Sequence, residues 1–371
     1  MTEKLGVIVL AGPDNGGTYQ YSLSMLQGLK HVKGFEITVY GDPQDTKLAQ
    51  SGYPIVRFSE SHAQQLAALV AHRLNIRLPD PFEAEDVLLA PIYSLALLHT
   101  SKPFAYALHD LQENYYPGNF SLWQRIWRRQ VHASLLRRTR RVVCESSHVK
   151  SDIVRLFGIA EERIVVMQAP PQREFLAEPG AEKLQEVRSR LQLPNRFLFY
   201  PAQFWAHKNH LRLIEAFREV ISEAPDLELV LTGKKRDGYD AVMDAVDKLG
   251  LNGRVRHLGY VEQDELQAVY RLATALVMPS LFESISIPIY EAFQVGTPVV
   301  ASAVLAIPEQ VGDAGVLFEP TSVASIRDAI LKITRDPAAA SLLGKKGRDR
   351  MMQMTPERYG YQLQNLLGEL R

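Results

Sequence analysis

Short apolar runs alternate with amphipathic stretches along most of the chain. The first run, Leu5–Leu10, is followed by the loop Ala-Gly-Pro-Asp-Asn-Gly-Gly and then by the amphipathic stretch Thr18–Val32. This succession is typical of a strand, a glycine-rich loop and a helix. Further runs follow at Glu36–Tyr40, Val87–Ala90, Phe104–Leu108, Arg141–Cys144 and Ile164–Met167. Because strands that are buried on both faces form continuous apolar runs, the pattern predicts a parallel sheet covered by helices.

The same alternation begins again after Ala169. Its apolar runs are Phe197–Tyr200, Leu227–Leu231, Val255–Leu258, Ala275–Met278 and Pro298–Ala301. Two prolines and a charged segment separate the two groups, so we place the connection between domains within residues 169–194. A chain of 371 residues is long enough for two such cores. We therefore predict an α/β protein with two Rossmann-like domains, residues 1–180 and 181–354, and a C-terminal helix in residues 355–371 that packs back on the first domain.

Composition narrows the class of protein. Lys plus Arg and Asp plus Glu number 42 each, so the chain has no global positive field for nucleic acid. The single cysteine, Cys144, excludes an internal disulfide and a thiolate metal cluster. No secretory signal and no apolar run of membrane-spanning length is found, and we expect a cytoplasmic protein. Neither an Asp-x-Asp triplet nor zinc-ligand spacing occurs, so no metal is expected.

Two glutamates eight positions apart form the most informative motif. Glu283 lies in a loop after an apolar strand, and Glu291 lies in a helix whose first turn follows Pro288. Free amides at that helix start can bind a phosphate, and the carboxylates can accept hydrogen bonds from sugar and ribose hydroxyls. The spacing alone also fits a solvated helix face.

The flanking residues make the motif more specific. The segment Pro279–Ala292, closed by Gly296-Thr297-Pro298, resembles the signature of the retaining GT-B glycosyltransferases of family four (glycosyl transferases group 1). The resemblance covers nearly the whole chain. It implies two Rossmann-like domains whose parallel sheets face a central cleft, the N-terminal one on the acceptor side and the C-terminal one binding the nucleotide sugar. It also implies that Glu283 lies beside the transferred sugar and that Glu291 binds the ribose.

The loop between the two glutamates departs from the family pattern. Where the family has Glu-Gly-Phe-Gly-Leu-Pro, this chain has Glu-Ser-Ile-Ser-Ile-Pro. The backbone amides that we expect to face the donor belong to Ser284, Ile285, Ser286 and Ile287. These amides survive the replacement of glycine, but any position that needs a positive φ would be strained.

Three further segments resemble donor-binding loops of the family. Lys208 stands where the first strand of the second domain leads into a helix, so its ammonium group adds to free amides as a receptor for a diphosphate. Gln203 takes the place of the usual arginine, which leaves Lys208 most of the phosphate charge. Gly16 and Gly17 follow the first strand, without the Gly-x-Gly-x-x-Gly spacing of NAD enzymes. Gly233 ends another strand. An exposed lysine and ordinary turn glycines are the alternative interpretation.

His109 and Asp110 follow the strand Phe104–Leu108, at the strand end where doubly wound sheets bind their ligands. The histidine could accept a proton or bind a sugar hydroxyl, and the aspartate could orient it or contact the acceptor. The string His-Asp-Leu-Gln resembles the corresponding segment of bacterial mannosyl- and rhamnosyl-type transferases of surface-polysaccharide synthesis. A purely structural histidine is the alternative.

Residues 121–141 carry seven arginines and no acid. Trp123, Trp127, Val131 and Leu135 form a stripe at i, i+4 spacing, which can serve only one partner. One interpretation is a core helix with solvated arginines. The other is an interfacial helix whose membrane or acceptor side includes Trp123, Trp127, Arg125, Arg128 and Arg129.

The resemblance implies a hexosyltransferase that moves a sugar, with mannose or a deoxyhexose as candidates, from a GDP-, UDP- or dTDP-linked donor to a glycan or lipid-linked acceptor with retention. No cofactor or metal is expected, and His109, Glu283 and Lys208 are the expected catalytic residues. The enzyme would act in cell-surface polysaccharide synthesis, as a cytoplasmic protein or peripherally at the inner face of the membrane. A nucleotide-sugar epimerase of the same fold and a non-catalytic nucleotide-sugar-binding subunit are the two alternatives.

Overall fold

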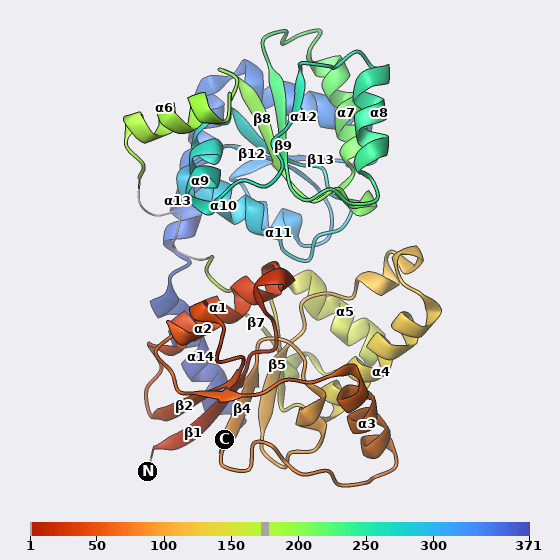
Figure 1. Cartoon of the computed structure of the whole chain (residues 1–371), viewed down its shortest axis with the longest axis vertical. Coiled ribbons are helices and arrows are strands. Elements are labelled where there is room, and N and C mark those ends of the chain that lie inside the picture. Colours follow the sequence, from red (N-terminus) through yellow and green to blue (C-terminus); the bar gives the residue numbers. More distant parts are fainter. Residues whose placement is uncertain (1, 172–177) are drawn as a thin grey trace. The chain divides into compact units, whose positions relative to one another are not determined.

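The computed structural model describes residues 2–171 and 178–371. The chain forms two compact units, Met1–Gln172 with Met354–Arg371 and Arg173–Gln353 (Figure 1). The first boundary therefore lies at residue 172, where the sequence pattern suggested 180. The polar helix α6 (Ala181–Arg190) packs on α9 (Gln263–Leu272) of the second unit.

The first unit is built on a seven-stranded parallel sheet in the order β3-β2-β1-β4-β5-β6-β7. The order reverses between β1 and β4, which is the switch point where doubly wound sheets bind ligands. The strands are β1 (Glu3–Ile8), β2 (Phe35–Gly41), β3 (Ile55–Arg57), β4 (Val87–Ala90), β5 (Phe104–Ala107), β6 (Arg141–Cys144) and β7 (Ile164–Val166).

Helices cover both faces of this sheet (Figure 1). On one face, α1 (Gly17–Leu29) and α14 (Pro356–Leu370) share an apolar cluster with alternate residues of the strands. On the other face, α3 (His62–Arg73), α4 (Leu122–Arg138) and α5 (Ser147–Phe157) pack with the short helix η2 (Leu95–Leu98). The remaining short helices are α2 (Thr46–Ala49), η1 (Pro13–Asn15), η3 (Gln112–Asn114), η4 (Pro117–Asn119) and η5 (Glu161–Arg163).

The helix α14 completes the first unit although it follows the whole second unit in sequence. It crosses α1 where glycines face each other, because a Cβ on Gly360 would lie 2.5 Å from the carbonyl oxygen of Gly28. The Tyr359 hydroxyl lies 3.3 Å from that of Tyr21, and Leu363 is fully buried in the same cluster. The glycines thus let the two backbones approach closely.

The second unit has a six-stranded parallel sheet in the order β10-β9-β8-β11-β12-β13. Its strands are β8 (Phe197–Pro201), β9 (Glu228–Thr232), β10 (Val255–His257), β11 (Ala275–Met278), β12 (Val299–Ser302) and β13 (Gly315–Phe318). Helix α7 packs with α8 and α12, whereas α10 packs with α9 and α13 (Figure 1). The bounds are η7 (Ala206–Lys208), α7 (His210–Val220), α8 (Tyr239–Lys248), α10 (Ile287–Val295), α11 (Ile307–Val311), α12 (Val323–Arg335) and α13 (Pro337–Met352).

The predicted fold class is confirmed, because both units are doubly wound parallel sheets with helices on both faces. The sequence pattern missed the strands β3 and β13. Both lie at a sheet edge and are only partly buried, so neither has the continuous apolar run of an inner strand.

Candidate functional site

An ion pair joins the two most informative motifs of the second unit. Lys208 ends η7, which follows β8, and its Nζ lies 2.5 Å from Oε1 of Glu283, which follows β11. The side chains are 20% and 11% exposed, so the pair is largely withdrawn from water. Because β8 and β11 are parallel neighbours, their carboxyl ends lie together. The structure thus brings together two predicted site residues that are 75 positions apart.

A buried asparagine holds the two loops of this ion pair in place. The amide of Asn209 donates to the carbonyl oxygens of Pro279 at 2.9 Å and Pro320 at 2.8 Å. Its φ of 59° is left-handed, a conformation that asparagine tolerates better than most residues. The Leu281 amide also donates to the His207 carbonyl at 2.7 Å. The loop of Lys208 is therefore pinned to the loop of Glu283 by the protein itself.

Glu291 lies in the second turn of α10 and is buried. The Tyr270 hydroxyl donates to its Oε2 at 2.7 Å. Burial raises the pKa of Glu291 to about 7, although the hydrogen bond from Tyr270 acts in the opposite direction. One carboxylate oxygen is thus held by the protein, and the group titrates near neutral pH.

The loop before α10 is not strained by its lack of glycine. None of the four residues Ser284, Ile285, Ser286 and Ile287 has a positive φ. The Ser286 amide donates to Oε1 of Gln310 at 2.9 Å, and the Gln310 amide donates back to the Ser286 carbonyl at 2.6 Å. Of the amides predicted to face the donor, that of Ser286 is therefore already paired within the unit. The amides of Ser284 and Ile285 have no partner in the part of the chain that the structure describes.

Arg236 was not identified from the sequence, yet it lies beside the expected phosphate loop. Its Nε donates to Oε1 of Gln203 at 2.9 Å, and its guanidinium carbon lies 5.0 Å from the ring centre of Trp205. Gly233, with a φ of 125°, makes this approach possible, because a Cβ there would lie 2.5 Å from the Ala202 carbonyl oxygen. An arginine from the neighbouring loop thus lies against Gln203, the position where the family pattern has an arginine. The sequence shows the lysines and the arginine after β9, but not which loop they meet.

The glycine pair of the first unit begins a helix. Gly16 has a left-handed φ of 55° and caps α1, and Gly17 is the first residue of that helix. A side chain at Gly16 would meet open space, so only the backbone conformation favours glycine there. Both amides stand at the start of a 13-residue helix, where an anion is favoured.

His109 is largely buried, and both of its ring nitrogens face acceptors. Nδ1 lies 3.0 Å from Oε2 of Glu145, and Nε2 lies 2.8 Å from the Pro91 carbonyl oxygen. Burial lowers the pKa of His109, but the hydrogen bonds to Glu145 and Pro91 and the Glu145 charge outweigh it, so the pKa is raised. This surrounding favours a positively charged imidazolium and leaves no free nitrogen to accept a proton.

Asp110 takes part in a cluster that ties its loop to α4. Arg128 Nη2 donates to Oδ1 of Asp110 at 2.9 Å, and its Nε donates to Oε2 of the buried Glu113 at 2.8 Å. Arg128 is 27% exposed on its side chain. It therefore supports the loop after β5 and is not one of the freely exposed cations of the basic segment.

The apolar stripe of α4 is divided between two environments. Val131 and Leu135 are fully buried, and Trp127 packs partly buried against the same core. Trp123 is 79% exposed, and its neighbours Leu122 and Ile126 are 64% and 41% exposed. The expectation of a single partner for the whole stripe is therefore wrong: α4 is anchored by its second half, while its first half faces solvent.

Within the described residues, no group of three or more His, Cys, Asp or Glu side chains is arranged to hold a metal ion. None of the described helices combines the length and the apolar character that crossing a membrane would need.

Two family models match the two halves of the chain. Residues 15–169 match Glycosyltransferase Family 4, and residues 183–350 match Glycosyl transferases group 1. The chain is 29% identical over 217 residues to O-antigen chain mannosyltransferase B of Escherichia coli, covering 58% of this chain and 57% of that protein. It is 25% identical to O-antigen chain mannosyltransferase RfbU of Salmonella typhimurium over 357 residues, 92% of this chain and 95% of that protein.

Solved structures share the fold. The crystal structure of Anabaena Alr3699/HepE in complex with UDP and glucose covers 99% of both chains with a TM-score of 0.77 at 18% identity. The structure of WaaG, a glycosyltransferase involved in lipopolysaccharide biosynthesis, gives a TM-score of 0.69 at 16% identity over 98% of this chain and 99% of that one. With both units matched, the chain belongs to the group 1 and family 4 glycosyltransferases of GT-B fold.

Proposed function

We propose that this chain transfers a hexosyl residue from a nucleoside diphosphate donor to a glycan or lipid-linked acceptor, with retention at the anomeric carbon, in cell-surface polysaccharide synthesis. The ion pair of Lys208 and Glu283 at the carboxyl ends of β8 and β11 carries this proposal. The mannosyltransferase relatives support mannose as the first sugar to test.

Lys208 and Glu283 have separate roles when a donor binds. A diphosphate competes with Glu283 for the Lys208 ammonium group, because it carries more negative charge than one carboxylate. The released Glu283 carboxylate then accepts a hydrogen bond from a hydroxyl of the sugar. Lys208 stabilises the negative charge that develops on the leaving phosphate oxygen. When Lys208 exchanges Glu283 for the diphosphate, the donor is bound and the Glu283 carboxylate is freed for the sugar in one step.

The rest of the donor site follows from the second unit. The free oxygen of Glu291 accepts from a ribose hydroxyl while Tyr270 holds the other oxygen. Arg236 supplies a second cation toward the diphosphate, since Gln203 binds its Nε and leaves its terminal nitrogens without a hydrogen-bond partner in the described residues. The Ser284 and Ile285 amides complete the set of phosphate donors of the second unit.

The reaction needs no protein nucleophile. The bond between the anomeric carbon and the phosphate oxygen breaks, and the acceptor oxygen forms its new bond on the same face of the sugar. The acceptor proton passes to the departing phosphate oxygen. His109, held as an imidazolium by Glu145, contributes positive charge on the acceptor side, where Asp110 orients the acceptor. No metal takes part in these steps.

The first test screens GDP-, UDP- and dTDP-sugars for thermal stabilisation, since a ligand of the folded state raises apparent stability by mass action. The stabilising donor is then incubated with polyprenyl-linked and free glycan acceptors, and the anomeric configuration of the product is read by NMR. Retained configuration is expected, and an inverted product would refute the mechanism. An isomerised nucleotide sugar formed without acceptor identifies an epimerase. Tight donor binding without any turnover identifies a binding subunit.

We also propose that the chain contacts a membrane peripherally, on the cytoplasmic side. The exposed first half of α4 supports this, because Leu122, Trp123 and Ile126 are apolar and the arginines beside them attract anionic lipid.

A further inference from the structure

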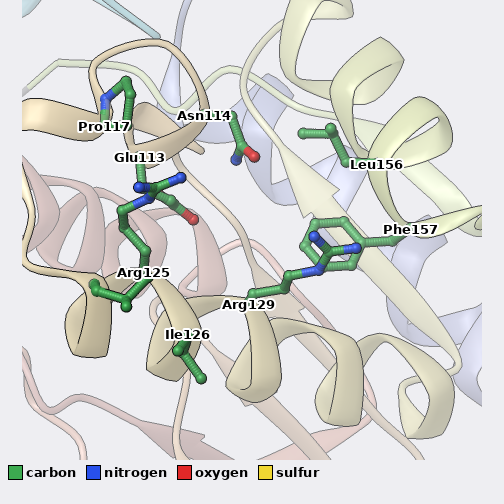
Figure 2. Close-up of a pocket in the computed structure, with 9 residues that line it drawn as sticks. Glu113, Asn114, Pro117, Arg125, Ile126, Arg129, Leu156 and Phe157 are labelled. Atoms are coloured by element: carbon green, nitrogen blue, oxygen red, sulfur yellow. The ribbon is translucent and has the colours of Figure 1, made fainter.

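A pocket of about 260 Å³ lies in the first unit between α4 and the end of α5. Figure 2 shows Arg125, Ile126 and Arg129 of α4 on one side and Leu156 and Phe157 of α5 on the other. The loop after β5 closes one end. We propose that this pocket binds the phosphate group and the first carbons of a membrane lipid, the lipid that carries the acceptor. The inference rests on the proposed function for the identity of that lipid.

The charges of the pocket select an anion. Arg125 and Arg129 lie one turn apart on the same face of α4, and neither has an acidic partner among the described residues. Glu113 is the one acid in the lining, and its carboxylate is held by Arg128 at 2.8 Å. Arg128 is shared between Glu113 and Asp110, so the three arginines and two carboxylates of this region keep a net positive charge, and the two unpaired guanidinium groups carry it. Guanidinium groups bind phosphate oxygens with paired N–H donors, which suits this arrangement.

The walls of the pocket select an amphiphile over a free anion. Ile126, Leu156 and Phe157 give it an apolar side that would contribute nothing to a solvated phosphate. Leu122 also lines the pocket, and the exposed side chains of Leu122 and of the next residue, Trp123, suit the boundary of a bilayer. At about 30 Å³ for each water molecule, the volume equals about nine waters, which is room for a phosphate and a short apolar segment. Whole drug-sized ligands need more space.

The pocket is connected to the acceptor residues by the cluster around Arg128. Glu113 lines the pocket, Arg128 joins it to Asp110, and Asp110 follows His109 directly in the chain. A phosphate held by Arg125 and Arg129 therefore lies at the far end of the same loop that begins at His109. The sugar attached to that phosphate can extend along the loop toward the histidine.

The test measures binding of the full chain to phosphatidylcholine vesicles that contain a minor fraction of a polyprenyl phosphate, with pure phosphatidylcholine vesicles as the baseline. The double variant Arg125→Gln with Arg129→Gln removes two charges from the pocket. The matched control, Arg137→Gln with Arg140→Gln, removes two charges from exposed arginines at the other end of α4 and beyond it. From the usual contribution of a cation at an anionic surface, the pocket variant should bind about thirtyfold more weakly.

The control variant should bind within about threefold of the wild type, because its arginines lie farther from the pocket than a Debye length. A third variant, Ile126→Ser, changes no charge and should also weaken binding. Equal losses in the two charge variants, or no loss with Ile126→Ser, would show a non-specific basic surface and overturn the pocket. If millimolar inorganic diphosphate displaces the vesicles completely, the pocket binds the anion without the lipid chain, and the proposal of a lipid ligand is refuted.

Unchanged thermal unfolding midpoints check that each variant folds. Because vesicle binding uses neither donor nor transfer, a failure of the proposed glycosyl transfer would leave this result standing, and the reverse also holds.

Discussion

Replacing Glu291 with alanine should weaken nucleoside diphosphate binding. The carboxylate is buried, and Tyr270 already holds one of its oxygens, so the other oxygen is positioned in advance for a ribose hydroxyl. Loss of such a charge-assisted hydrogen bond costs on the order of 1 to 3 kcal/mol. The dissociation constant should therefore rise by about fivefold to 150-fold.

The pH dependence of nucleoside diphosphate binding is a second test of the role of Glu291. The pKa of Glu291 is about 7 in the free protein, so the carboxyl group becomes protonated as the pH falls below neutral. Binding that needs the carboxylate should weaken between pH 7 and pH 5. Replacing Tyr270 with phenylalanine removes the hydrogen bond that lowers this pKa, and the weakening should begin at a higher pH.

The free energy of unfolding should change with pH in the opposite direction: it should rise as the pH falls, while nucleotide binding weakens. The folded-state pKa lies above the ordinary glutamate value of 4.5, so the folded chain holds the proton more tightly than the unfolded chain. This tighter proton binding stabilises the folded chain fully below pH 4.5, and the stabilisation is lost as the pH rises through 7. The free energy of unfolding changes by about 3 kcal/mol at most over this range. Glu291→Gln carries no charge, so it should be more stable than the wild type at pH 8.

Titration calorimetry across this pH range measures the binding, and denaturant unfolding measures the stability. Glu215→Gln is the matched control, because Glu215 is exposed on α7. If Glu291→Ala binds nucleoside diphosphate as tightly as the wild type, the ribose assignment is wrong. A binding profile with the same pH dependence in Glu291→Gln and the wild type would refute the titration argument.

Three further outcomes are expected. Glu283→Gln should retain nucleoside diphosphate binding, because Lys208 loses its competing partner, while the transfer rate falls by about a hundredfold or more. Equal losses of affinity and of transfer rate would contradict the exchange of Lys208 from Glu283 to the diphosphate. Arg236→Gln should weaken diphosphate binding measured by calorimetry, and an unchanged affinity would remove that arginine from the site. Chelation by EDTA should leave transfer rates largely intact, and a loss restored by added Mg²⁺ or Mn²⁺ would contradict the metal-independent mechanism.

The sheets were predictable because their inner strands are buried on both faces. Phe197–Tyr200 is a continuous apolar run and Leu227–Leu231 is interrupted only by Glu228, and they fall on β8 and β9. The strand β3 consists of Ile55, Val56 and Arg57, none fully buried, and so gives no such run. Pairing at a sheet edge depends on the neighbouring strand, and a local pattern does not contain that information.

The candidate site was predictable where a motif follows a strand end, and not where two loops meet. Lys208 and Glu283 stood out individually by their position and family resemblance. Arg236 reaches Gln203 across 33 positions, a contact decided by the order of β8 and β9 in the sheet. The division of the α4 stripe depends on where the core ends, which periodicity cannot show.

The return of the chain to its first unit sets an order for its synthesis. Residues 356–370 are made after the whole of the second unit, yet Leu363, Leu366, Leu367 and Leu370 fill the core beneath α1. The second unit is continuous in sequence and can fold as soon as it has been made. The first unit, although begun earlier, keeps an open apolar face on α1 until α14 arrives. A nascent chain should therefore become resistant to protease in its later half before its earlier one.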